Sequence, residues 1–252
     1  MLGPLKLLRA DSEKIDDLRW VTLSNHQAKG ASRVSAIPSL YNQPVSTLDA
    51  HLAHHPPNRK TGEEAFHLDG RSVGLALREF WQWSASDLIS NATRGRLAEY
   101  IIASALGLGS GVRSEWDAFD LLMPSGLRIE VKSCAYLQSW KQTRLSPIVF
   151  STPKTRSWDA GTGVMEKEAK RQADLYIFAL LSHSTSKQTL DPLDLDQWHF
   201  YPVSTSLLNE RTRSQHSITL KSLQKLCPDP KRYKDLAEAV RHFEMQRRAS
   251  GN

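Results

Sequence analysis

The stretch WDAFDLLMPSGLRIEVKS, residues 116–133, decides how this chain is expected to fold. Near its end apolar and charged residues alternate in the order Leu127, Arg128, Ile129, Glu130, Val131 and Lys132. A period of two is typical of a half-buried strand, so Glu130 and Lys132 are predicted to point the same way. An apolar run precedes Pro124-Ser125-Gly126, which has the residues of a short turn. The sequence therefore predicts a β-hairpin.

The register of this hairpin brings two carboxylates together. If Pro124 to Gly126 form the loop, counting back along both strands sets Leu121 opposite Ile129. The next pair is Asp120 opposite Glu130. Opposed side chains in an antiparallel pair have Cβ atoms roughly 4.5–5.5 Å apart, and like charges there destabilise a sheet. A divalent cation would neutralise them, and hard oxygen ligands suit Mg²⁺ or Mn²⁺ better than zinc. The alternative is a surface hairpin whose basic residues compensate the acids.

A third carboxylate, Glu99, is expected on a helix that precedes the hairpin. The run RGRLAEYIIASALGLG predicts a helix with Thr93 as its N-cap and an end near the glycines of Gly-Leu-Gly. The residues one turn away from Glu99 are apolar or small, so its carboxylate is expected to lie in an apolar face. A buried ionised acid is normally paired, metal-bound or neutralised. An ordinary salt bridge to Arg94 or Arg96 is the alternative.

A helix acid followed by Asp and Glu-x-Lys around a short hairpin resembles the PD-(D/E)XK nuclease superfamily. The order of predicted elements agrees with that resemblance. They are a helix near 93–106, strands near 116–123, 127–134 and 147–151, an amphipathic stretch at 164–173 and an apolar strand at 175–181. The resemblance implies an α/β protein of restriction endonuclease-like fold, with an αβββαβ core and a central mixed sheet flanked by helices. One departure is that Phe119, rather than proline, precedes Asp120.

The resemblance also implies roles for the acidic residues and the lysine. Asp120 and Glu130 would be metal ligands, and Glu99 would support the metal site or its water shell. Lys132 would position or deprotonate the attacking water. A bound Mg²⁺ or Mn²⁺ provides a nucleophilic hydroxide and relieves charge in the transition state of phosphodiester hydrolysis. The expected function is therefore metal-dependent DNA endonuclease activity, of the restriction or defence type.

Other functions stay open. A DNA repair or junction-specific nuclease is the alternative within the same class. A nucleic-acid-binding module that kept the fold without cutting is another, although a degenerated site should have lost at least one of the four residues. The last is an unrelated α/β protein whose acidic hairpin is structural. Cleavage of both strands of a duplex would favour a homodimer, because each site cuts one strand.

DNA is the expected partner. The segment SCAYLQSWKQTR, residues 133–144, leaves the second hairpin strand toward where DNA should lie. Its candidate nucleic-acid contacts are Gln138, Lys141, Gln142 and Arg144, and the alternative is a solvated loop. The 33 Lys and Arg exceed the 27 Asp and Glu, which gives a formal net charge of +6. This balance favours a polyanionic partner.

The rest of the chain sets the domain organisation. Residues 1–70 are expected to form a helical and irregular, partly flexible extension, and residues 71–252 the nuclease-like domain. Ser72 to Ser90 predicts aromatic-rich helices covering the sheet. Trp198 to Val203 predicts an edge strand, because Pro202 donates no hydrogen bond to a neighbour. Helices are expected at 218–226 and 230–248.

The cysteines and the hydropathy suggest a location. Only two cysteines, Cys134 and Cys227, are present, which is too few for a disulfide framework and indicates a reducing cytoplasm. No apolar run approaches the ~20 residues that cross a bilayer. The sequence therefore predicts a cytoplasmic protein with no membrane partner.

Overall fold

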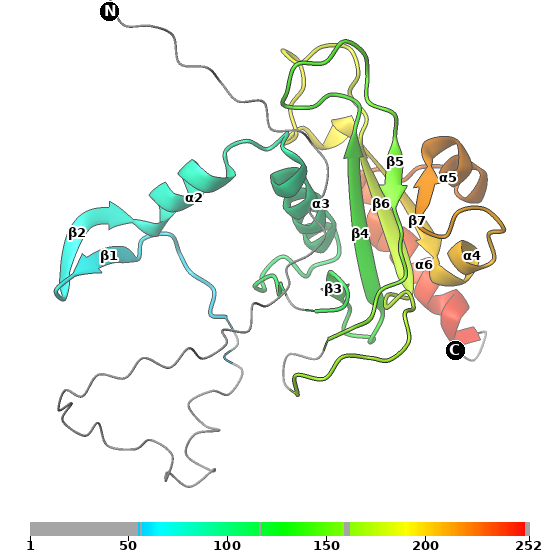
Figure 1. Ribbon diagram of the computed structural model, residues 1–252, viewed down its shortest axis with the longest axis horizontal. Helices are drawn as coiled ribbons and strands as arrows, with labels where there is room; N and C mark the ends of the chain where they lie inside the picture. Colours follow the sequence, from blue (N-terminus) through cyan, green and yellow to red (C-terminus); the bar gives the residue numbers. More distant parts are fainter. Residues whose placement is uncertain (1–54, 56, 116, 159–161, 250–252) are drawn as a thin grey trace, which may run out of the picture. The chain divides into compact units, whose positions relative to one another are not determined.

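The computed structural model describes residues 55, 57–115, 117–158 and 162–249. Its central sheet has the order β3-β4-β6-β7 (Figure 1). These strands are β3 (Leu121–Leu122), β4 (Arg128–Ala135), β6 (Leu175–Leu181) and β7 (Trp198–Ser204). Because β4 and β6 run parallel while β3 and β7 are antiparallel to their neighbours, the sheet is mixed. The predicted α/β class with a central mixed sheet flanked by helices is confirmed.

The strand β6 is the centre of the hydrophobic core. Its sequence LYIFALL is buried at every residue, because β4 and β7 cover its edges and other elements cover both its faces. A continuous apolar run is typical of a strand in this position. The strand β7 lies at the edge of the sheet, as Pro202 predicted, since an edge tolerates a residue without an N–H group.

Each face of the sheet has its own core. One face packs against α3 (Asn91–Ala105) and α6 (Leu236–Ala249), through buried residues such as Ile102, Ile129 and Val240. The other packs against β5 (Val149–Ser151), β8 (Ser217–Thr219), α4 (Thr205–Asn209) and α5 (Leu220–Leu226), through residues such as Phe150 and Phe178. The two 3-10 helices are η2 (Leu195–Gln197) and η3 (Tyr233–Asp235). Helices were expected at 218–226 and 230–248, and α5, η3 and α6 fall there.

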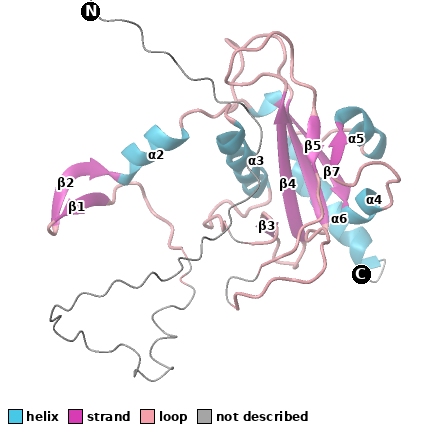
Figure 2. Cartoon of the chain, viewed as in Figure 1, coloured by secondary structure: helices cyan, strands magenta, loops and turns pink. Residues whose placement is uncertain are grey.

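Three expected elements differ from the sequence analysis. The strand expected near 116–123 is reduced to the two residues of β3. The strand expected at 147–151 forms β5 but pairs with β8 in a separate two-stranded sheet. The amphipathic stretch 164–173 forms no helix, and Figure 2 draws the described part of the β5–β6 connection as loop.

Side-chain hydrogen bonds explain why 164–173 is not helical. The Glu166 carboxylate accepts bonds from Lys170 and Gln172, and the buried Arg171 donates to the carbonyl oxygen of Thr152. Gln172 also donates to the carbonyl oxygen of Thr155. The bonds to Thr152 and Thr155 are long-range, and with the bridge between Thr155 and Lys170 they hold the segment beside residues 152–158 and override its helix propensity.

The segment before α3 also differs from its prediction. It forms β1 (Ala65–Leu68), β2 (Arg71–Ala76) and α2 (Leu77–Ala85). Asp69 and Gly70 join the two strands with positive φ values of 49° and 75°, the backbone that an Asp-Gly hairpin turn needs. No residue of α2 is buried, so the expectation that these aromatics cover the sheet is wrong. Residues 1–54 of the expected N-terminal extension lie outside the described residues.

Two further observations bear on the sequence analysis. Cys134 and Cys227 are both free thiols. Among the described residues, no helix has the length and apolar character that crossing a membrane requires.

Candidate active site

The β3–β4 hairpin has the predicted register, with Leu121 opposite Ile129 and Leu122 opposite Arg128. The ladder ends at Asp120. Its backbone N–H still donates to the carbonyl oxygen of Ile129 at 3.0 Å, but its carboxylate accepts the N–H of Val131 at 2.7 Å. A side chain, instead of a strand carbonyl group, therefore satisfies Val131, and this bond fixes the Asp120 carboxylate beside β4.

Glu130 and Lys132 lie on one face of β4, as the alternation predicted. Their neighbours Ile129 and Val131 point into the core that contains α3, so the two charged residues face the other way. The Lys132 ammonium donates to the Glu130 carboxylate, and their side chains are 32% and 18% exposed. In the parallel register, Glu130 lies beside Tyr176 of β6. The ion pair is thus half-buried at the surface of the sheet.

The pKa of Asp120 reflects the charges of the other predicted catalytic residues. Burial raises the pKa of Asp120 to about 7, and the charge of Glu130 adds to that rise. The Val131 N–H opposes it, Glu99 raises the pKa further and Lys132 lowers it. Burial also raises the pKa of the Tyr176 hydroxyl, and Glu130 and Asp120 raise it too. The other three predicted catalytic residues, Glu99, Glu130 and Lys132, therefore all act on the half-buried carboxyl group of Asp120.

Glu99 is largely buried on α3, with a side chain 13% exposed, as its apolar face predicted. Its partner is Arg113, a residue that the sequence analysis did not consider. The Nε of Arg113 donates to one carboxylate oxygen, and Nη2 donates to the other at 3.4 Å. Nη1 of the same guanidinium donates to Glu115. The bond to Glu99 is the largest cause that raises the pKa of Arg113 above its ordinary value, and the charge of Glu115 adds to the rise.

The two partners expected for Glu99 are engaged elsewhere. Arg94 is buried and donates to Ile89 and Gln138, while Arg96 pairs with Glu115 at 3.8 Å. No local pattern could have indicated Arg113, because it lies in an irregular segment between α3 and β3. The N-cap of α3 is Ser90 rather than Thr93.

The donor set fits a hard cation. In the described part of the chain, no three carboxylate, imidazole or thiol groups are gathered closely enough to complete a metal site. Mg²⁺ is commonly held by only one or two carboxylates, together with waters and substrate phosphates. Asp120 and Glu130 can provide two carboxylates, and the charge repulsion recorded in the pKa of Asp120 would be relieved by a cation. Residues that suit Mg²⁺ or Mn²⁺ are therefore present.

The four candidate DNA contacts after β4 differ in accessibility. Lys141 and Arg144 are exposed. Gln142 uses its side chain to hold the loop, accepting the N–H of Gln138 at 2.7 Å and donating to the carbonyl oxygen of Tyr136. Gln138 is buried, accepts from Arg94 and donates to the carbonyl oxygen of Ala135. In this conformation Gln138 supports the loop from inside and does not reach the surface.

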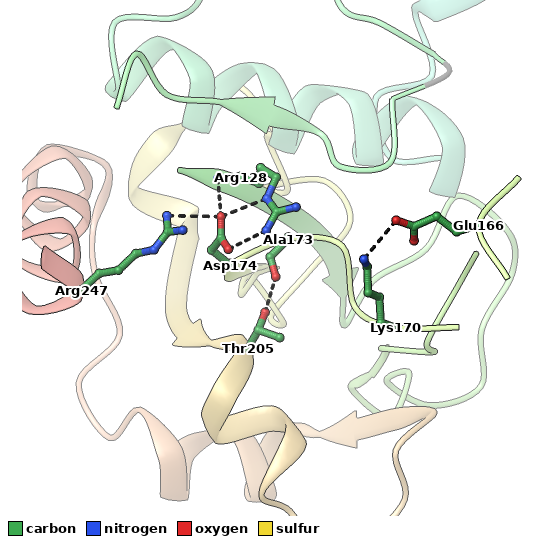
Figure 3. Close-up of polar contacts among 7 residues, drawn as sticks. All are labelled: Arg128, Glu166, Lys170, Ala173, Asp174, Thr205 and Arg247. Atoms are coloured by element: carbon green, nitrogen blue, oxygen red, sulfur yellow. Dashed lines mark hydrogen bonds and ion pairs between the residues drawn. The ribbon is translucent and has the colours of Figure 1, made fainter. Parts of the chain in front are cut away.

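A separate acidic residue holds the elements around the site. Asp174, at the start of β6, accepts two bonds from the Arg128 guanidinium, at 3.1 and 2.8 Å, and one from its backbone N–H at 3.0 Å (Figure 3). Arg247 of α6 approaches the same carboxylate at 3.4 Å. Burial pushes the pKa of Asp174 upward, but these donors outweigh it and the pKa falls below its ordinary value. Asp174 therefore ties β4, β6 and α6 together.

Comparison with known proteins identifies a family. The family model described as bacteriophage T4 endonuclease IV matches residues 73–222, which include α3, the hairpin and β6. No curated protein and no solved structure matches the chain significantly.

Proposed function

Because the chain belongs to the bacteriophage T4 endonuclease IV family, we propose that it is a metal-dependent endonuclease that hydrolyses DNA phosphodiester bonds. The reaction centre is the cluster of Glu99, Asp120, Glu130 and Lys132, a site of the PD-(D/E)XK type. The observation that carries this proposal is the half-buried Asp120 carboxylate, which the N–H of Val131 holds beside β4 and on which the charges of Glu130 and Glu99 act. Placing acidic groups close to a desolvated carboxylate is energetically unfavourable, and such arrangements are typical of functional sites that bind a cation.

The proposed ligands of Mg²⁺ or Mn²⁺ are Asp120 and Glu130. When bound, the ion would supply Lewis-acid stabilisation and a more acidic water. Asp120 is held for this task by Val131, whose N–H donates to one of the two carboxylate oxygens of Asp120. Glu99 is already bound by Arg113, so we assign it to the water shell of the site rather than to direct coordination.

Lys132 has the position of a residue that orients water. Its ammonium lies on the same strand face as Glu130 and already contacts that carboxylate. An ammonium with three donors can keep this bond and donate to a water molecule or a phosphate oxygen at the same time. Lys132 therefore places the nucleophile beside the acids and offsets the negative charge that develops on the phosphate.

In the proposed complex, DNA contacts the segment after β4, where Lys141 and Arg144 are exposed. The formal net charge of +6 supports binding to a polyanion. The restriction or defence role, the homodimer and the cytoplasmic location stay predictions.

Binding of Mn²⁺ tests the site independently of turnover. Calorimetric titration of the wild-type protein should show saturable binding, and Asp120→Ala should remove it. Asp117→Ala is the matched control, because Asp117 is exposed three residues away and has no part in the proposed site. Equal binding by the wild type and Asp120→Ala, or no binding by either, would refute the metal site.

A further inference from the structure

Arg113 is a cation at the candidate active site that the resemblance to known nucleases does not explain. Its side chain is 36% exposed and lies between two acids of different character. One edge of the guanidinium, Nε and Nη2, faces Glu99, whose side chain is 13% exposed. The other edge, through Nη1, faces Glu115, whose side chain is 61% exposed. Arg113 is therefore anchored on one edge and held by a solvated partner on the other.

The charge of the site requires a cation of this kind. Two other carboxylates, Glu130 and Glu99, act on Asp120, and a DNA phosphate that approaches them brings another negative charge. Lys132 is the one cation that the pattern predicted there, and it is paired with Glu130. Arg113 also interacts with Asp120, which is one of the causes of its raised pKa.

Other arginines of the domain are less suited to the task. Arg94 and Arg171 are only 4% and 6% exposed and bind mainly carbonyl and amide groups inside the protein. The Arg128 guanidinium is held by two bonds to Asp174. Arg113 is partly exposed and pairs with Glu99 and Glu115, so a substrate phosphate can reach its guanidinium.

We propose that Arg113 binds the DNA phosphate at the cut. Glu99 orients the guanidinium through its buried edge, and Glu115 occupies the exposed edge until the phosphate replaces it. A planar guanidinium suits this exchange, because its two edges can each bind an oxyanion. Release of Glu115 costs little, since an exposed ion pair contributes only about 0–1 kcal/mol. This inference rests on the proposed nuclease function.

Paired substitutions test it. Arg113→Gln should lower DNA cleavage on the order of 100-fold, the loss expected when one stabilising donor is removed from a transition state. Arg113→Lys keeps the charge without the two-edged fork and should show a smaller loss. Glu115→Gln should cut at least as fast as the wild type and bind DNA more tightly in Ca²⁺, because the competitor of the phosphate is gone. Arg96→Gln is the control, since Arg96 also pairs with Glu115 but not with Glu99.

The outcomes separate this inference from the proposed function. A purely structural role for Arg113 predicts that Glu115→Gln loses activity together with Arg113→Gln, and that result would overturn the inference. So would Arg113→Gln cutting within twofold of the wild type. If the wild type fails to cut, the nuclease proposal is refuted, and DNA binding in Ca²⁺ still decides about Arg113. Arg113→Gln should then reduce the slope of log K against log salt by the amount expected for about one phosphate contact. An unchanged slope would count against the proposed role of Arg113.

Discussion

Asp120 immediately precedes the strand β3, and its carboxylate both accepts the N–H of Val131 and belongs to the proposed acid cluster. The bond from Val131 favours the charged form of this group, whereas burial and the two other acids favour the neutral form. The second influence prevails, because the pKa rises from 3.8 to about 7. The Asp120 carboxylate is thus held beside β4 at the expense of stability, as is common at functional sites.

The pH dependence of stability should reveal this cost. Between pH 4 and 7 the native protein holds a proton on Asp120 that the unfolded chain releases, so the stability of the metal-free protein should fall as pH rises through this window. Asp120→Asn keeps an oxygen acceptor for Val131 and removes the titration. At pH 8 in EDTA it should be more stable than the wild type by roughly 1–4 kcal/mol, with little difference at pH 4. Urea denaturation at both values measures this, and a less stable Asp120→Asn at pH 8 would be contrary to the account.

Lys132 should separate turnover from metal binding. Lys132→Ala is expected to retain Mn²⁺ binding, because the carboxylates remain, but to lose cleavage. Lys132→Arg should also fail, since a planar fork cannot replace a compact ammonium beside Glu130. Calorimetry and single-turnover cleavage are the measurements. An active Lys132→Arg enzyme would show that the residue acts only through its charge.

At the scale of elements, strong hydrophobic periodicity made the sheet and α3 predictable. The apolar run of β6 and the alternation of β4 are local patterns, and the turn between β3 and β4 fixed the register that places Asp120 by Glu130. The candidate acids could be found for the same reason.

The misses came from tertiary contacts that no local pattern records. Residues 164–173 have helical propensity, but bonds from Arg171 and Gln172 to residues 152 and 155 keep them extended. Arg113 was missed because it reaches Glu99 from an irregular segment. In contrast, the Asp69-Gly70 turn between β1 and β2 was a local hairpin signal that the sequence analysis overlooked.

The bonds of Asp174 to Arg128 of β4 and Arg247 of α6 should be important for stability. Asp174→Ala leaves the half-buried Arg128 and Arg247 without their acceptor, and should destabilise the protein by about 2–4 kcal/mol. Arg247→Gln removes only the longer contact of 3.4 Å and should cost about 1 kcal/mol or less. Urea denaturation at pH 7 compares them. Equal stability of Asp174→Ala and the wild type would show that packing alone holds these elements together.

At the scale of the whole molecule, net positive charge should make DNA binding depend on salt. In Ca²⁺, log K for non-cognate DNA should fall linearly with log salt, with a slope of roughly −0.9 per phosphate contact. Replacing the exposed Lys141 and Arg144 together with Gln should reduce the number of contacts by about two. A double substitution of Lys221 and Lys225 on α5, far along the chain, is the control. An unchanged slope for the first pair would place the DNA path elsewhere.

The central claim is that DNA is cut at the acid cluster around Asp120. Supercoiled plasmid and single-stranded DNA should be incubated with the wild type, Asp120→Asn and Glu130→Gln, in Mg²⁺ and in EDTA, after melting curves have shown that all three are folded. The account predicts cleavage by the wild type in Mg²⁺ only, and loss of cleavage by at least about 100-fold in both variants. Near wild-type cutting by either folded variant, or undiminished cutting in EDTA, would contradict it.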